Sequence, residues 1–395
     1  MKKNPRKVNN FLKIKILIIC FVATFSSCNQ GENRDSYIDQ QPFLKSEDIR
    51  YAEGFQIEYF EHYTRVIINN PWTRSHIPYE VYYLYKDPEV LKNDKIKIPT
   101  DGIQIQIPIK SVSVNTFSYF EFLSLIDELS TVTGVTDGLR VYNPEIRSKL
   151  KSKEIIDLGD PFNPNIELTM TLKPDAIINS AYAQLDNYSE RLDQTGLPVI
   201  YSLEWMEDNP LARAEWIKMI ASFYNKNELA ENIFNEIEEQ YFKVQGMAEK
   251  IDKKKSVLSG DNFQGTWYVP GGNSFNAKIF RDAGLSYLYE NNNKSGSVGL
   301  DIESILIQFG NADIWFGCDV NTYSELVAKD SKYLLFNSVK KRQVFNNHER
   351  TTPLGGNDYF ESAIAYPNLI LSDIIKAAYP QLLPNYSYTY IRPLE

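Results

Sequence analysis

The chain has 395 residues, of which 43% are hydrophobic and 24% charged, and its formal net charge is −9. This composition is typical of globular domains and excludes a disordered, collagen-like or multi-span membrane protein. The first 27 residues hold six basic and no acidic side chains, so a product that begins at residue 28 carries a net charge of −15. Because nucleic-acid binding normally needs a basic face, we expect no nucleic-acid partner.

The amino terminus predicts a lipoprotein signal. Residues 1–15 are basic, and residues 16–27 form an uncharged, mainly apolar stretch that ends in small residues before Cys28. This is the layout of a secretory signal, and it is too short for the ~20 residues of a membrane-spanning helix. The run Thr-Phe-Ser-Ser-Cys resembles a bacterial lipobox, although Phe25 stands where that motif has Leu.

The resemblance to a lipobox implies cleavage before Cys28, lipid on that cysteine, and a membrane-anchored protein in the periplasm. The alternative is an ordinary cleaved signal followed by a chance cysteine. The polar run after Cys28 favours a tether over residues 28–50. The sequence does not choose between inner-membrane and outer-membrane anchoring.

The remaining cysteine and the histidines argue against an enzyme. Because Cys20 lies within the signal, Cys318 is left alone in the mature chain, where we expect a structural role at a strand end. The three histidines are scattered, and no nucleophile elbow, paired-histidine zinc motif or Ser/His/Asp arrangement is present. We therefore expect no catalytic residue, no resident metal and no cofactor.

The pattern along the chain predicts an α/β protein. Residues 51–85 alternate in hydrophobicity and predict a meander of short strands. Residues 103–115 carry an extended signal, and residues 117–129 have helical spacing. From there strands and helices alternate at βαβ intervals, which favours parallel sheets. The expected strands cover residues 155–158, 176–179, 199–202, 256–258, 314–316 and 344–345.

A long helical stretch divides this pattern. Asn209 is suited to the N-cap of a helix and Pro210 to its first turn, and we expect this helix over residues 211–224. A second helix is expected over residues 228–250. The second helix would be ~33 Å long, enough to join two lobes. We therefore expect three regions after the tether, namely an N-terminal lobe with the meander, a helical linker and a C-terminal lobe, at residues 51–208, 209–252 and 253–395.

Two segments repeat one plan. Residues 165–178 and 301–316 each begin with Asn or Asp as a helix N-cap, continue with Ile-Glu, and close on an Asp that opens an apolar strand. Glu167 and Glu303 occupy equivalent places. A glycine precedes each segment, Gly134 in one half and Gly284 in the other, and we expect each to follow an apolar helix.

Several stretches together resemble the class III periplasmic binding proteins of ABC importers, which carry cobalamin, haem or ferric siderophores. The resemblance covers about residues 100–385, and its order and spacing are specific. The matching stretches include Ile-Ile-Asp-Leu-Gly-Asp from residue 155, Leu-Lys-Pro-Asp-Ala-Ile-Ile from 172, Pro-Leu-Ala-Arg-Ala-Glu-Trp-Ile-Lys from 210, and Tyr-Pro-Asn-Leu-Ile-Leu-Ser-Asp-Ile-Ile-Lys from 366.

The resemblance implies two Rossmann-like lobes with parallel sheets, joined by one long helix, that hold a ligand between them. Ligand residues of this family come from loops after strands, here residues 115–119, 201–206, 261–268 and the segment around 350–358. One implied partner is a dimeric ABC permease, which would be contacted by one glutamate of each lobe, Glu167 and Glu303. The other is the ligand, and siderophore, haem and cobalamin all stay open as ligand classes. The implied ligand-binding residues are five aromatic side chains and one arginine: Phe117, Tyr119, Trp205, Trp267, Tyr268 and Arg350.

Two other functions stay open at this point. One is a ligand-capturing lipoprotein that serves an outer-membrane receptor, and permease genes beside the locus would argue against it. The other, a lipid-anchored α/β enzyme, would require turnover of a candidate ligand.

Overall fold

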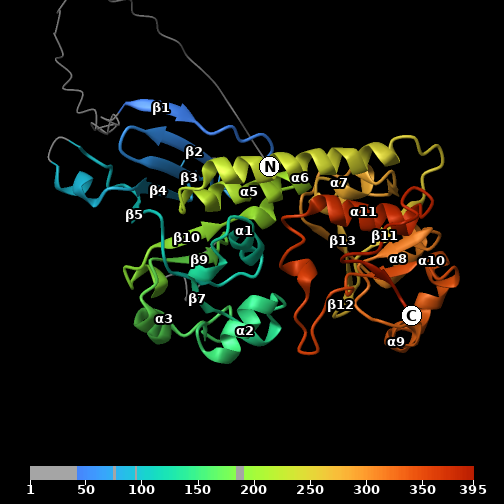
Figure 1. The fold of residues 1–395 in the computed structure, drawn as a ribbon. Helices are drawn as coiled ribbons and strands as arrows, with labels where there is room; N and C mark the ends of the chain where they lie inside the picture. Colours follow the sequence, from blue (N-terminus) through green and yellow to red (C-terminus); the bar gives the residue numbers. More distant parts are fainter. Residues whose placement is uncertain (1–41, 74–76, 94–95, 184–190) are drawn as a thin grey trace, which may run out of the picture. The chain divides into compact units, whose positions relative to one another are not determined.

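The computed structural model describes residues 42–73, 77–93, 96–183 and 191–395. The expected signal, Cys28 and most of the expected tether lie outside the described residues. Within them, no helix combines the length and the apolar character needed to cross a membrane. The tether is shorter than expected, because residues 43–46, assigned to it from their polar surroundings, form strand β1 (Figure 1).

The predicted meander is a five-stranded sheet, antiparallel except for its last pair. Its strands follow chain order: β1 (Phe43–Ser46), β2 (Phe55–Phe60), β3 (Thr64–Ile68), β4 (Glu80–Tyr85) and β5 (Ile103–Gln106). Tyr82 of β4 connects it to the first lobe, since its hydroxyl donates to Val199 O (2.9 Å) and accepts from Tyr201 N (2.8 Å).

The first lobe is built on a fully parallel sheet of order β10-β9-β6-β7-β8. Its strands are β6 (Val112–Val114), β7 (Val132–Val135), β8 (Ile156–Asp157), β9 (Ala176–Ser180) and β10 (Val199–Ser202). The helices of this lobe that are described in full are α1 (Tyr119–Leu125), α2 (Pro144–Ser152) and α3 (Ile166–Leu172). The expected strands over 155–158, 176–179 and 199–202 are confirmed. The expectation for Gly134 is wrong: it lies inside β7, opposite Ser113, rather than after a helix.

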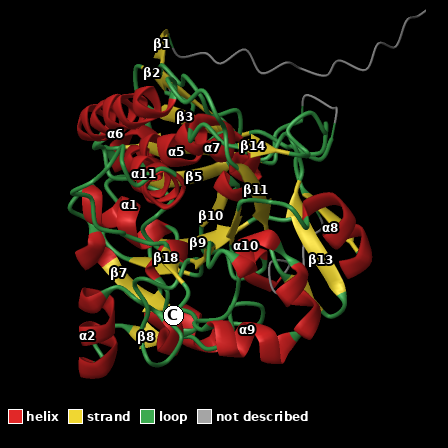
Figure 2. Cartoon of the chain, turned by 90° about the vertical axis from the view of Figure 1, so that its right-hand side faces the viewer, coloured by secondary structure: helices red, strands yellow, loops and turns green. Residues whose placement is uncertain are grey.

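Two helices follow, as predicted. They are α5 (Pro210–Ser222) and α6 (Asn227–Ala248), separated by Asn225 at a positive φ of 56°. Asn209 caps α5 by accepting from Leu211 N (3.0 Å). α6 is the long helix between the lobes and packs on α5 and on α11 (Pro367–Ala378) of the second lobe (Figures 1 and 2).

The second lobe holds a sheet of order β14-β11-β16-β17-β18, parallel except at β18. Its strands are β11 (Ser256–Ser259), β14 (Ser286–Tyr287), β16 (Ile314–Phe316), β17 (Val344–Asn346) and β18 (Arg392–Pro393). The remaining helices are α7 (Phe275–Asp282), α8 (Ile302–Phe309), α9 (Tyr323–Lys329) and α10 (Asn337–Lys340).

A small antiparallel sheet, not expected from the sequence, is attached to the second lobe. It has the order β12-β13-β15, made of β12 (Asn262–Phe263), β13 (Thr266–Pro270) and β15 (Ser297–Leu300). The stretch expected as a loop, 261–268, is therefore mostly a hairpin. α8 packs against β13 (Figure 2).

The internal repeat is present in atomic detail. Asn165 accepts from Leu168 N (3.0 Å) and Asp301 from Ser304 N (2.7 Å), so both predicted N-caps are confirmed. The closing aspartates match too: Asp175 Oδ2 accepts from Ser111 N (3.0 Å), at the start of β6, and Asp313 Oδ2 from Ser256 N (3.0 Å), at the start of β11. In each lobe the aspartate before the repeat strand therefore bonds the backbone at the start of the neighbouring parallel strand, β6 beside β9 and β11 beside β16.

The segment before β2 is fastened to α5 and to the turn that precedes it by two buried carboxylates. Glu215 accepts from the backbone N–H groups of residues 50, 51 and 52 at 2.8–2.9 Å, and Glu207 accepts from Gly54 N at 2.9 Å. Lys218, also buried, bridges Glu215 (3.0 Å) and the Asp48 carbonyl oxygen (2.8 Å). Buried charges are tolerated only with such partners.

Candidate functional site

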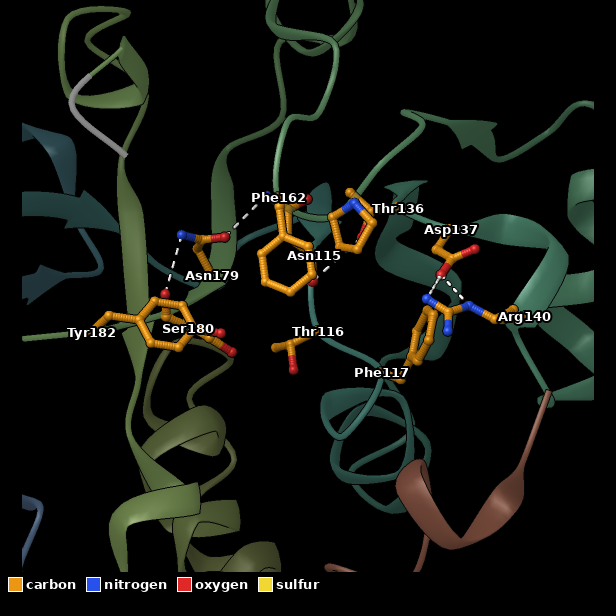
Figure 3. A pocket seen from close by; sticks show the side chains of 11 residues that line it. Asn115, Thr116, Phe117, Thr136, Asp137, Arg140, Phe162, Asn179, Ser180 and Tyr182 are labelled. Carbon is orange, nitrogen blue, oxygen red and sulfur yellow. Dashed lines mark hydrogen bonds and ion pairs between the residues drawn. The ribbon is translucent and has the colours of Figure 1, made fainter. Parts of the chain in front are cut away.

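The first lobe has a cavity of about 180 Å³ at the carboxyl ends of its parallel strands (Figure 3). Asn115 follows β6 and Asn179 lies near the end of β9, the two strands between which the chain reverses its direction of travel across the sheet. Asn115 Nδ2 donates to Asn179 Oδ1 (3.3 Å). Open α/β sheets bind ligands at such switch points.

Aromatic side chains surround this cavity. Phe117, predicted as a ligand residue, lines it, and Figure 3 shows the rings of Phe162 and Tyr182 on other sides of the same space. Phe162 is 74% exposed and Tyr182 is 44% exposed. Exposed rings around a small space with both polar and apolar walls suit a flat, partly apolar ligand.

A larger cavity of about 450 Å³ lies between the lobes. The first lobe supplies residues 205–208, the turn after β10. The second lobe supplies the ends of β11 and β16, at Gly260 and Gly317, together with Tyr268. Gly260 has a φ of +87°, and a Cβ there would stand 1.9 Å from the Tyr268 carbonyl oxygen, so only glycine lets the hairpin lie this close.

Trp205 connects the two cavities. Its side chain lines the cavity between the lobes and is 40% exposed. Its ring centroid lies 5.8 Å from that of Tyr182, at the first cavity, and 6.3 Å from that of Trp72, in the turn between β3 and β4. The N-terminal sheet therefore brings an aromatic side chain to the site, which the sequence did not indicate.

Two predicted ligand residues lie in the core instead. Tyr119 is 0% exposed, and its hydroxyl donates to Glu204 Oε2 (3.3 Å). The other oxygen of this carboxylate, Oε1, accepts from Ser118 Oγ (2.9 Å). Trp267 is also 0% exposed, and its Nε1 donates to Ser259 O (3.1 Å). Neither ring can touch a ligand in this conformation. Tyr119 is the first residue of α1 and is buried in the core, and Trp267 in β13 points inward while its neighbour Tyr268 is exposed. Tyr119 instead supports the turn that carries Trp205.

Arg350, the predicted anion-binding residue, lies away from both cavities. Its Nη1 pairs with Asp358 Oδ2 at 3.1 Å, and its guanidinium lies 5.5 Å from the Tyr390 ring centroid. The predicted glutamates are both exposed, at the second position of α3 and of α8. Glu303 pairs with Lys332 Nζ (2.8 Å), whereas Glu167 has no ion pair within the described residues.

A segment of the second lobe, residues 350–366, reaches across to the first lobe beside α1 and α2 (Figure 1). Glu361 is 2% exposed, and its carboxylate accepts from the backbone N–H groups of Tyr142 and Asn143, the second at 2.8 Å. Tyr366 OH donates to Glu121 Oε1 at 2.7 Å. We name these contacts of Glu361 and Tyr366 the clasp.

The clasp should weaken as pH rises. Burial raises the pKa of Glu361 from 4.5 to about 7, with smaller contributions from the Asp358 and Glu121 carboxylates, so the folded state binds a proton that the unfolded state releases. Its stabilisation is full below pH 4.5 and is lost as pH rises through 7, by about 3 kcal/mol at most. Urea unfolding at pH 5 and pH 8 should show this loss in the wild type but not in Glu361→Gln.

The matched control is Glu145→Gln, which removes an exposed carboxylate from α2. It should follow the wild-type pH dependence. Parallel pH curves for wild type and Glu361→Gln would contradict the assignment.

Within the described residues no group of three or more His, Cys, Asp or Glu side chains could hold a metal ion. Cys318 is fully buried, and burial raises the pKa of its thiol to about 12. This agrees with the structural role predicted for it at the end of β16.

Of the ligand residues expected from the sequence, Phe117, Trp205 and Tyr268 line cavities, whereas Asn179, Phe162 and Trp72 lie at the site without having been expected there. Asn179 had a usable signal, because Asn115 and Asn179 each follow a buried apolar run in parallel strands. Phe162 and Trp72 had none, since they reach the site from a loop and from a sheet whose placement depends on tertiary packing.

Comparison with known proteins agrees with this architecture. A family model described as "Periplasmic binding protein" matches residues 116–351. An uncharacterized lipoprotein of Methanocaldococcus jannaschii is 24% identical, over 95% of this chain and 94% of its own length.

Two solved structures share the fold. A possible iron-binding (periplasmic solute-binding) protein of Staphylococcus epidermidis has a TM-score of 0.54 at 18% identity, over 69% of this chain and 99% of its own. The periplasmic vitamin B12-binding protein of Vibrio cholerae has a TM-score of 0.51 at 12% identity, over 71% and 99%.

Proposed function

Since the chain belongs to the periplasmic binding protein family of ABC importers, we propose that it is a lipid-anchored substrate-binding component. Members of this family are binding proteins and not enzymes. The proposed cargo is an iron complex or a corrinoid. The iron complex would be a ferric siderophore or haem. It would be held between the lobes and delivered to a dimeric permease.

The observation that carries this proposal is the cavity between the lobes, with Trp205 and Tyr268 on opposite sides of it. Both rings are 40–46% exposed and so can be covered by a ligand. The neighbouring aromatic cavity in the first lobe extends the apolar surface. Flat chelates and tetrapyrrole-type rings bury best against such walls.

A thermal-shift panel tests the ligand. The full-length chain in mild detergent is heated with haemin, cyanocobalamin, a ferric catecholate siderophore and a ferric citrate complex. A ligand present at 100 times its dissociation constant stabilises the protein by ~2.7 kcal/mol, which moves the melting temperature measurably. No shift with any of the four would contradict the proposed ligand class.

The lipid anchor is a separate part of the proposal. It rests on the basic and apolar residues before Cys28 and is supported by the description of the archaeal relative as a lipoprotein. Cys28→Ser should abolish labelling by a fatty-acid analogue and release the protein from the membrane fraction, because no acceptor for lipid remains. Cys20→Ser is the control and should keep both. Labelling that persists in Cys28→Ser would refute the anchor.

A further inference from the structure

A third cavity, of about 260 Å³, lies between the lobes next to the one lined by Trp205. The two share lining residues, among them Phe275 and Tyr359. Arg213 enters the third cavity from the first turn of α5, with its guanidinium 4.6 Å from the Phe275 ring centroid. That stacking orients the charged group without neutralising it.

Within the described residues, the Arg213 side chain has neither a hydrogen bond nor an ion pair, and its Nε is buried without a partner. The two nearest candidates are already used. Glu204 accepts from Ser118 and Tyr119, and Glu207 accepts from Gly54 N and Trp216 Nε1. Burial lowers the pKa of Arg213, and the attraction of the Glu204 and Glu207 carboxylates opposes this only in part. A guanidinium stays charged in proteins, so a positive charge without a hydrogen-bonded or ion-paired partner lies at the cavity.

Two further donor groups line the same cavity. They are the hydroxyl of Tyr359, in the turn Asp358–Phe360, and the side-chain amide of Asn276, in α7. Among the described residues neither side chain has a hydrogen-bond partner. Three residues that carry donor groups, from three elements and one of them cationic, therefore line one cavity.

We infer that Arg213 anchors an oxyanion, a carboxylate or a phosphate group, carried by the captured ligand. This rests on the proposed function and narrows it: the site selects complexes with an acidic arm over neutral ones. The fork of a guanidinium matches both oxyanions with two parallel hydrogen bonds. An unpaired buried charge is costly, and the bound oxyanion would supply its missing partner.

The test uses small anions, so that it does not depend on identifying the ligand. The full-length chain in mild detergent is titrated with citrate and, separately, with inorganic phosphate, each against chloride of equal ionic strength, with the melting temperature as readout. The two arms distinguish carboxylate from phosphate. Wild type should be stabilised by at least one of them, and Arg213→Met should bind that anion about tenfold more weakly or worse.

Two comparisons separate binding from folding. Without anions, Arg213→Met should melt slightly above the wild type, because it removes a desolvated charge that has no hydrogen-bonded or ion-paired partner. The control is Arg147→Met, at an exposed arginine of α2. It should change neither the melting temperature without anions nor the shift that anions cause. Arg213→Lys should retain part of the anion effect, since it keeps the charge and loses the fork.

Three outcomes would overturn the inference: no anion effect on the wild type, an equal effect on Arg213→Met, or an anion-free melting temperature of Arg213→Met below that of Arg147→Met. Failure of the proposed function appears differently. In that case no ligand of the thermal-shift panel binds, while the oxyanion effect and its dependence on Arg213 remain.

Discussion

Cells that carry the Glu167→Ala, Glu303→Ala double variant should take up ligand no faster than cells that lack the protein, although the purified variant binds ligand as the wild type does. Both carboxylates are exposed at equivalent places in the two lobes, which suits a partner with two-fold symmetry. Charge-assisted pairs with arginines would fix the register of that complex. The measurement is uptake of a radiolabelled iron complex or corrinoid.

The two glutamates predicted to dock with the permease differ before any partner binds. A hydrogen bond from Lys332 lowers the pKa of Glu303, so this carboxylate is ionised, and one of its oxygens already accepts from the Lys332 ammonium group. The Glu303–Lys332 pair is exposed on both sides and can exchange for a permease arginine. Lys332→Ala should therefore leave uptake intact or improve it.

The control for the double variant is Glu228→Ala. Glu228 is also an exposed glutamate in the first turn of a helix, α6, but it lies outside the repeat. Its replacement therefore removes a similar interaction with a helix dipole without touching a predicted docking position. Normal uptake by the folded double variant would remove the docking role.

The second large effect separates two tryptophans that the sequence treated alike. Trp205→Ala should weaken ligand binding about thirtyfold or more, because it removes a half-exposed ring at the centre of the site, and should change stability little. Trp267→Ala should cost about 3–5 kcal/mol of unfolding free energy, because it empties a core position packed against Trp315 and Phe336.

Calorimetric titration and urea unfolding measure the two quantities. The assignment of Trp205 fails if its loss leaves affinity unchanged. The assignment of Trp267 to the core fails if its loss leaves the unfolding free energy unchanged.

Local signals explain which parts of the fold were predictable. The caps at Asn165 and Asp301 and the strand at 199–202 follow from short-range patterns, and each is found where expected. β7 was missed because Thr133 and Gly134 interrupt its apolar run. Pairing with β6 nevertheless holds it in the sheet, which is a tertiary effect.

The candidate site was predictable only as loops. Family resemblance and strand order pointed to residues 115–119 and 201–206, and both reach a cavity. Which side chains face the ligand depends on how each segment continues. Phe117 and Trp205 lie in turns and line cavities, whereas Tyr119 begins α1 and is buried. Arg213 was passed over because a charged residue in the first turn of a helix is usually solvated.

The carboxylates of Glu207 and Glu215 decide which part of the chain can fold on its own. Their hydrogen-bond donors come from residues 50–54, far upstream of residue 116, where the family match begins. Without those donors the buried Glu207 carboxylate would keep only Trp216 Nε1, and the buried Glu215 carboxylate only Lys218, as hydrogen-bond donors. The smallest autonomous folding unit of this chain therefore includes the N-terminal sheet, and in evolution that sheet could be gained or lost only together with the residues of α5 that receive it.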